Sequence, residues 1–144
     1  MRISAKAEYA CAAMLELAAS YGNPQPVRIK AIAAAQGISD RFLVQILLQL
    51  KTAGLVASVR GAAGGYQLAR SPEAITLAQI INAIDDRTLA PRSALSAVNR
   101  TAAVDVLLGV WQEVQLQEQK ALEKLTLAEL LRRTQANNAL VSQI

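Results

Sequence analysis

Apolar residues recur at intervals of three and four along the first twenty residues of the chain. This spacing predicts a helix over about 4–21, with one buried face formed by Ala7, Cys11, Met14 and Ala18. The sequence GNPQP at 22–26 ends this helix, because its two prolines cannot continue one and its glycine favours a helix end. A second, shorter helix is predicted over about 28–36, before Gly37 breaks it.

A third helix is predicted to follow Ser39 and to run to about Ala53. Ser39 is a favourable N-cap residue, and Asp40 adds a negative charge to the positively polarised first turn. The apolar residues of this helix share one face, which we expect to meet the core: Phe42, Leu43, Ile46, Leu47 and Leu50. The opposite face holds Arg41, Gln45, Leu48 and Thr52.

Two short helices joined by the tight turn QGIS have the outline of a helix–turn–helix, here over about 28–53. The second helix of such a unit enters the major groove of DNA, where Arg41 and Gln45 can hydrogen-bond to base edges. Val44 or Leu48 could pack on a thymine methyl there. The pattern leaves an ordinary surface helix open as the alternative.

The stretch RGAAGGYQLAR, from Arg60 to Arg70, follows a segment rich in β-branched residues. A dinucleotide-binding loop would need a helix after its glycines, whereas Tyr66, Gln67 and Leu68 alternate as a strand does. We therefore predict a β-hairpin over 55–70 that forms a wing beside the helix–turn–helix. Arg60, at the base of the tip, could reach a minor groove or phosphates. Alternatively, Arg60 and Arg70 are edge-strand charges that keep the hairpin soluble.

The second half of the chain is predicted to be helical. Thr76 and Gln79 form a capping box before one helix, and Thr126 and Glu129 form another before a short last helix. Between them lie a loop over about 85–100 and one long helix over about 101–125, about 37 Å in length. The tail after residue 133 has little amphipathic pattern, and we expect it to be mobile or to pack only at its apolar end.

The long helix is apolar on more than one side, so both sides need burial. One can pack on its own chain, and the other would most simply meet a second copy, as an antiparallel pair of helices in a homodimer. The residues assigned to this contact are Leu107, Leu108, Trp111, Val114 and Ala121. The alternative is that the chain covers the helix by itself.

Composition and charge narrow the functional classes. The 144 residues are 53% apolar but only 3% aromatic, which favours packed helices, and no apolar run is long enough to span a membrane. Residues 1–70 carry eight basic and three acidic residues, a net +5, whereas residues 71–144 sum to −1, so the first half is suited to a polyanion. The single cysteine fits a reducing cytoplasm. With no histidine and no nucleophile or phosphate-loop motif, we expect no enzymatic activity.

These residues resemble the Rrf-type bacterial transcription regulators, the family that includes IscR, NsrR and CymR. The resemblance lies in the first helix, in the G-I-S-x-x-[YF]-L-x-Q pattern and in the R-G-x-x-G-G-Y-x-L wing, and covers about residues 1–86 closely. It implies a mainly α-helical fold with a small β-hairpin, in which a winged helix–turn–helix DNA-binding domain (1–86) precedes a sensor-type loop, a dimerisation helix and a short last helix (87–144). It also implies a homodimer that binds palindromic operators in double-stranded DNA.

Carried over by position, the resemblance implies that Arg2 contacts the DNA backbone, that Ser39, Arg41 and Gln45 lie on the recognition helix, and that Arg60 is the minor-groove residue. The full set that we expect to face DNA is Arg2, Arg28, Ser39, Arg41, Gln45, Arg60 and Gly61. Some members read a base with glutamate where this chain has Val44, so their operators cannot be assumed here.

Cluster-binding members hold an iron–sulfur centre with three cysteines in the loop before the long helix. That loop has neither cysteine nor histidine in this chain. Cys11 alone, even beside Glu8, cannot supply the ligands that such a cluster needs, and we expect it to be a small core residue. We therefore predict no cluster and no metal site. Our leading hypothesis for the function is a regulator that acts as a repressor. Control through a partner protein docked at 88–98, or through a small-molecule effector, is the alternative.

Overall fold

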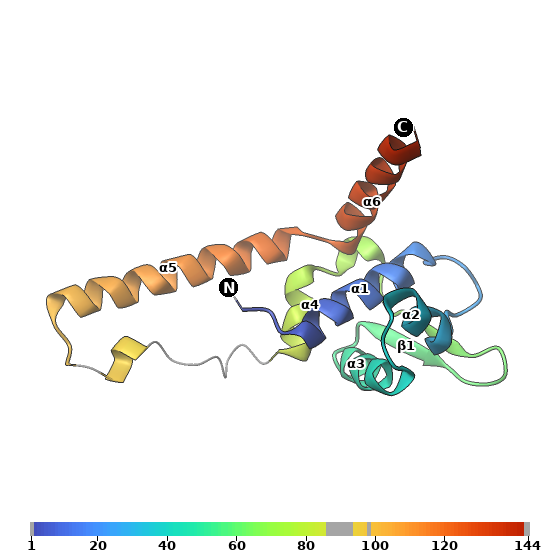
Figure 1. The fold of residues 1–144 in the computed structure, drawn as a ribbon, viewed down its shortest axis with the longest axis horizontal. Helices are drawn as coiled ribbons and strands as arrows, with labels where there is room; N and C mark the ends of the chain where they lie inside the picture. Colours follow the sequence, from blue (N-terminus) through green and yellow to red (C-terminus); the bar gives the residue numbers. More distant parts are fainter. Residues whose placement is uncertain (1, 86–93, 98, 143–144) are drawn as a thin grey trace.

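The computed structural model describes residues 2–85, 94–97 and 99–142, and within them the fold is helical apart from one β-hairpin (Figure 1). The elements are α1 (Ala5–Ala19), α2 (Ile29–Gln36), α3 (Asp40–Thr52), β1 (Val56–Val59), β2 (Gly65–Leu68), the 3₁₀ turn η1 (Pro72–Ala74), α4 (Leu77–Ile84), the 3₁₀ turn η3 (Ala94–Ala97), α5 (Ala102–Lys124) and α6 (Leu127–Ser142). The predicted fold class is confirmed. The predicted domain division at 86–87 falls outside the described residues and stays a prediction.

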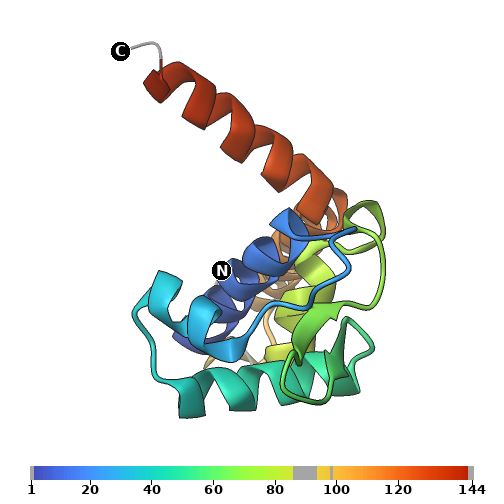
Figure 2. The ribbon, with the colours of Figure 1, turned by 90° about the vertical axis from the view of Figure 1, so that its right-hand side faces the viewer.

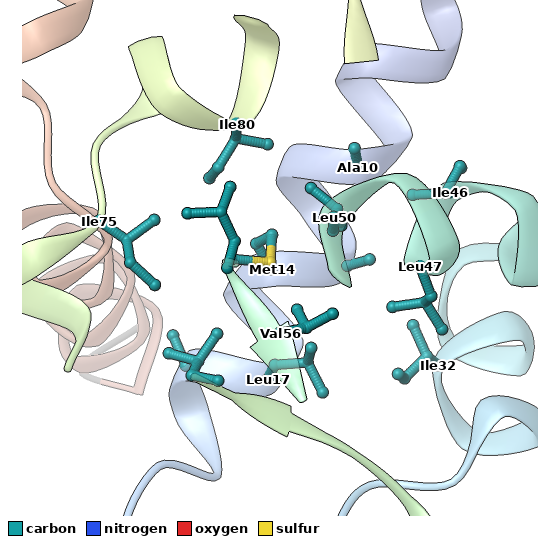
Figure 3. Close-up of a cluster of buried hydrophobic side chains, with 14 of the residues drawn as sticks. Ala10, Met14, Leu17, Ile32, Ile46, Leu47, Leu50, Val56, Ile75 and Ile80 are labelled. Atoms are coloured by element: carbon teal, nitrogen blue, oxygen red, sulfur yellow. The ribbon is translucent and has the colours of Figure 1, made fainter. Parts of the chain in front are cut away.

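The core lies where α1 meets α3, the hairpin, α4 and α6. Met14 of α1 lies amid this cluster, with Leu50 of α3, Val56 of β1 and Ile80 of α4 around it (Figure 3). All the core positions predicted on α3 are buried except Phe42, which is half-buried. Phe42 instead packs edge-on against the ring of Tyr9 on α1, with ring centroids 5.8 Å apart, so α3 is held to α1 at its first turn.

The chain segments that precede α4 and α6 lie side by side. The N–H of Leu77 donates to the carbonyl of Leu125 (2.8 Å), and the N–H of Leu127 donates to the carbonyl of Ile75 (2.9 Å). The helix α4 begins with the predicted reciprocal capping box between Thr76 and Gln79. The two backbone hydrogen bonds join the start of α6 to the start of α4, and so to the core.

The second predicted capping box is only half formed. Thr126 accepts from the N–H of Glu129 (3.1 Å), but the Glu129 carboxylate takes hydrogen bonds from Arg132 and Arg133 on the next turn of α6. These bonds lower the pKa of Glu129 to about 2. The reciprocal cap is therefore replaced by an ion-pair network on the surface of α6.

The prediction of a short last helix was wrong in length, because α6 continues to Ser142. Residues 134–142 contain no glycine or proline to end the helix. Their amphipathic pattern is weak because this outer half projects from the body on the side away from α3, as Figures 1 and 2 show, and its side chains are exposed through Val141. The residues 143–144 lie outside the described part of the chain.

The long helix α5 contacts the body at its C-terminal end. Leu122 is buried there with Ala7 of α1 and with Ala78 and Ile81 of α4. From this anchor α5 reaches away from the helix–turn–helix, as Figure 1 shows. In the described parts of the chain no single helix is long and apolar enough to cross a membrane; the bent pair α2–α3 passes such a test by length and composition only.

Candidate nucleic-acid interface

The helices α2 and α3 form a helix–turn–helix. The chain changes direction by 113° between them, in the range that such units show. Gly37 ends α2 in the left-handed conformation (φ 66°), which glycine adopts without steric cost. Ser39 is the N-cap of α3, and its hydroxyl oxygen accepts from the N–H of Phe42 (3.1 Å). The turn and the cap therefore set the direction in which α3 crosses the core.

The outward face of α3 is the one that the sequence predicted. Arg41, Gln45, Leu48 and Thr52 are exposed, while Val44 is half-buried at the edge. Leu48 is an exposed leucine that the core does not use, with 52% of its surface accessible. An arginine, a glutamine and an apolar side chain on one exposed helix face match the groups that read base edges and thymine methyls in a major groove.

The wing is the antiparallel pair β1–β2, in a register that runs from Val56 opposite Leu68 to Val59 opposite Gly65. Arg60 follows β1 directly and is exposed. Gly61 has φ 108°, a conformation that other residues rarely adopt. In the tip from Gly61 to Gly64, Gly61 alone has a positive φ, so the other two glycines of the motif need another explanation.

Gly64 and Gly65 are required by close packing inside the wing and beside it. A Cβ on Gly64 would lie 2.3 Å from the carbonyl oxygen of Val59, and one on Gly65 would lie 2.3 Å from the carbonyl oxygen of Val27. Val27 and Tyr66 also exchange two backbone hydrogen bonds, of 2.9 and 2.8 Å. Two glycines of the motif therefore leave room for the protein's own backbone.

Two basic side chains connect the helix–turn–helix to the wing. A guanidinium N–H of Arg28 donates to the carbonyl oxygen of Ala62 at the wing tip (2.8 Å). The ammonium of Lys51, in the last turn of α3, donates to Ser58 of β1 (2.8 Å). Neither contact has a signature in the sequence, because each joins residues that only the fold brings together.

The remaining predicted positions are exposed. Arg2 lies just before α1, whose N-cap Ser4 is bonded through its N–H (3.1 Å) and its hydroxyl (2.5 Å) to the carboxylate of Asp85. These bonds tie the start of α1 to the end of α4. Arg70, which follows β2, is exposed as well.

The basic residues of the first half have no acidic partner among the described residues. Within residues 2–85, no lysine or arginine forms a salt bridge with another described residue, and all except Lys6 are exposed. The described salt bridges belong to residues 100–133. The two halves of the chain therefore differ in net charge and also in whether their described basic residues form salt bridges.

Comparisons with known proteins agree with this arrangement. Residues 3–133 match the Rrf2 family, described as "Iron-dependent Transcriptional regulator". The chain belongs to the Rrf2 family of transcriptional regulators. It is therefore a DNA-binding regulator of the helix–turn–helix type.

Individual relatives extend the similarity over most of the chain. An HTH-type transcriptional regulator of Mycobacterium tuberculosis is 40% identical over 131 residues, which cover 90% of this chain and 81% of the relative. CymR of Bacillus subtilis is 42% identical over 85 residues, covering 60% and 61%. Among solved structures, IscR of T. potens has a TM-score of 0.76 at 36% identity (93% and 88% covered), and CymR of B. subtilis has 0.73 at 33% (90% and 95% covered).

The packing of Gly65 predicts that alanine destabilises the protein at this position but not at a glycine with open space around it. Gly65→Ala should lower the free energy of unfolding by about 1–3 kcal/mol, because the new Cβ collides with backbone that a side-chain movement cannot clear. Gly109→Ala, in α5 with open space where the new Cβ would lie, is the matched control and should raise the free energy of unfolding by about 0.5–1 kcal/mol. Chemical denaturation measures both; equal effects of the two substitutions would contradict the close approach.

Proposed function

We propose that this Rrf2-family chain is a sequence-specific repressor that binds a palindromic operator as a homodimer. The observation that carries the proposal is the exposed face of α3 beside a wing whose arginine is unpaired among the described residues. In a dimer, two such faces would enter successive major grooves about 34–36 Å apart. Of the predicted DNA-facing set, we propose Arg2, Ser39, Arg41, Gln45, Arg60 and Gly61 as contacts on this basis, whereas Arg28 is already hydrogen-bonded within the protein, to Ala62. Because the sequence contains no catalytic motif, we also propose that the protein is not an enzyme.

Within that proposal, Arg41 and Arg60 have different tasks. Arg41→Ala should weaken binding to the preferred duplex and relax its sequence preference, because it removes a hydrogen bond to a base edge. Arg60→Ala should weaken most duplexes alike and lower the slope of log affinity against log salt by about 0.9 for each phosphate that is no longer neutralised. Selection from a random duplex pool, followed by salt titration, measures both. Lys120→Ala, which removes an exposed charge from α5, is the control; if all three variants bind like wild type, the assigned face is wrong.

The dimer is supported by the exposed apolar surface of α5. Leu107, Trp111 and Val114 are exposed large side chains, and Ala121 is exposed in the same stripe. Val106 and Val110, which the sequence analysis did not assign, are exposed beside them. Leu108 is instead half-buried. A helix that leaves such a stripe open is best covered by the same stripe of a second copy.

The opposite face of α5 provides a control for this interface. Val114 and Leu116 are 49% and 54% exposed, but they point about 160° apart around the helix axis. Val114→Glu should shift the protein from dimer to monomer, because it buries an unpaired charge in the interface, whereas Leu116→Glu should leave the dimer intact. Sedimentation equilibrium measures the outcome, and a dimer that survives Val114→Glu would exclude this contact.

We further propose that the regulator works without an iron–sulfur cluster, although its family is described as iron-dependent. The donors do not fit such a centre: Cys11 is the one cysteine in the sequence, there is no histidine, and the thiol packs between the two core clusters. Burial, with smaller contributions from the charges of Glu8 and Asp85, raises the pKa of the Cys11 thiol to about 11, so the thiolate that binds iron is disfavoured. Most of the proposed dock at 88–98 lies outside the described residues.

Iron and sulfide analysis tests the cluster proposal directly. Protein purified without oxygen should contain neither element in stoichiometric amount, and its visible spectrum should lack thiolate-to-iron bands. Cys11→Ser should give the same analysis as wild type. Stoichiometric iron and sulfide that disappear in Cys11→Ser would refute the proposal.

A further inference from the structure

Arg28 occupies a position that a basic residue does not favour. It is the N-cap of α2, yet its side chain makes no capping hydrogen bond. Short side chains that accept from the first free N–H groups are preferred there, and a positive charge is unfavourable near the positive end of the helix. The helix gains no capping hydrogen bond from this side chain, so the role of the side chain has to be sought elsewhere.

Its contact lies in the wing. The guanidinium donates to the carbonyl oxygen of Ala62, 34 residues along the chain, at 2.8 Å. Val27, the residue before it, holds Tyr66 through two backbone hydrogen bonds and lies against Gly65. Two consecutive residues at the start of α2 therefore hold the wing, one at its second strand and one at its tip.

The two sides of the tip are held together by backbone contacts. The N–H of Gly64 donates to the carbonyl of Gly61 (2.9 Å). A Cβ on Gly64 would lie 3.1 Å from the carbonyl carbon of Arg60, so the two backbones are in contact across the tip. We therefore expect that a hydrogen bond to the carbonyl of Ala62 also restrains the backbone of Arg60.

We propose that Arg28 is a positioning residue, which fixes the wing tip so that Arg60 is presented to DNA in one orientation. A wing that is already ordered loses less conformational freedom when it binds. This inference rests on the proposed DNA contact of Arg60, but the anchoring of the tip can be tested without DNA. It gives Arg28 a task that differs from the direct phosphate contact suggested by its charge.

The first test uses the free protein. In Arg28→Met, the amides of Gly64 and Tyr66 should exchange hydrogen about fivefold faster than in wild type, as expected for removal of one hydrogen bond of ordinary strength. Lys30→Met is the matched control: Lys30 is exposed on the same helix, has no side-chain partner among the described residues, and carries the same charge. It should leave wing exchange unchanged. Equal exchange in Arg28→Met and wild type overturns the proposal, whether or not the protein binds DNA.

The second test is a double-mutant cycle on a labelled mixed-sequence duplex. If Arg28 acts through Arg60, Arg28→Met should weaken binding no more than Arg60→Met does, and the double variant should match Arg60→Met within about twofold. If Arg28 is instead a phosphate ligand, the effect of its removal multiplies with that of Arg60 and lowers the salt slope by a further ~0.9. Multiplying effects overturn the proposal. If wild type fails to bind the duplex, the proposed function fails, and the exchange experiment alone decides the role of Arg28.

Discussion

The contact of Gly65 with the backbone of Val27 is the constraint on which the proposed DNA-facing surface depends. It brings the second strand of the hairpin against the start of α2, where the two backbones exchange hydrogen bonds. From the other side, Lys51 ties α3 to β1. The hairpin and the helix–turn–helix therefore form one unit, and the position of Arg60 relative to α3 follows from backbone packing.

The basic half of the chain is also the half whose described basic residues form no salt bridges. In residues 2–85 the exposed bases have no acidic partner among the described residues, whereas Arg100, Arg132 and Arg133 are each paired with a nearby carboxylate. Unpaired bases on a surface keep their full attraction for a polyanion, and paired ones lose most of it. Membership of the Rrf2 family agrees with a DNA-binding first half.

Periodicity predicted α1 to α5 well because each of these helices has a clear start or stop signal in its own sequence. Ser39, Gly37 and the Thr76–Gln79 box all act over three or four residues, so their effects do not depend on the rest of the fold. The exposed face of α3 followed from the same periodicity. The prediction failed at the end of α6, where no core lies opposite residues 134–142 to impose a pattern.

The sequence by itself determined helices α1 to α5, the face of α3 that points away from the core, and the wing motif that indicated the family. Only the tertiary structure decided what Gly65 and Arg28 contact. Gly65 is needed because the backbone of Val27 passes within contact distance, and Arg28 reaches a carbonyl 34 residues away. Local propensity acts between neighbours in the chain, whereas these contacts join segments that become neighbours only when the hairpin folds back on α2.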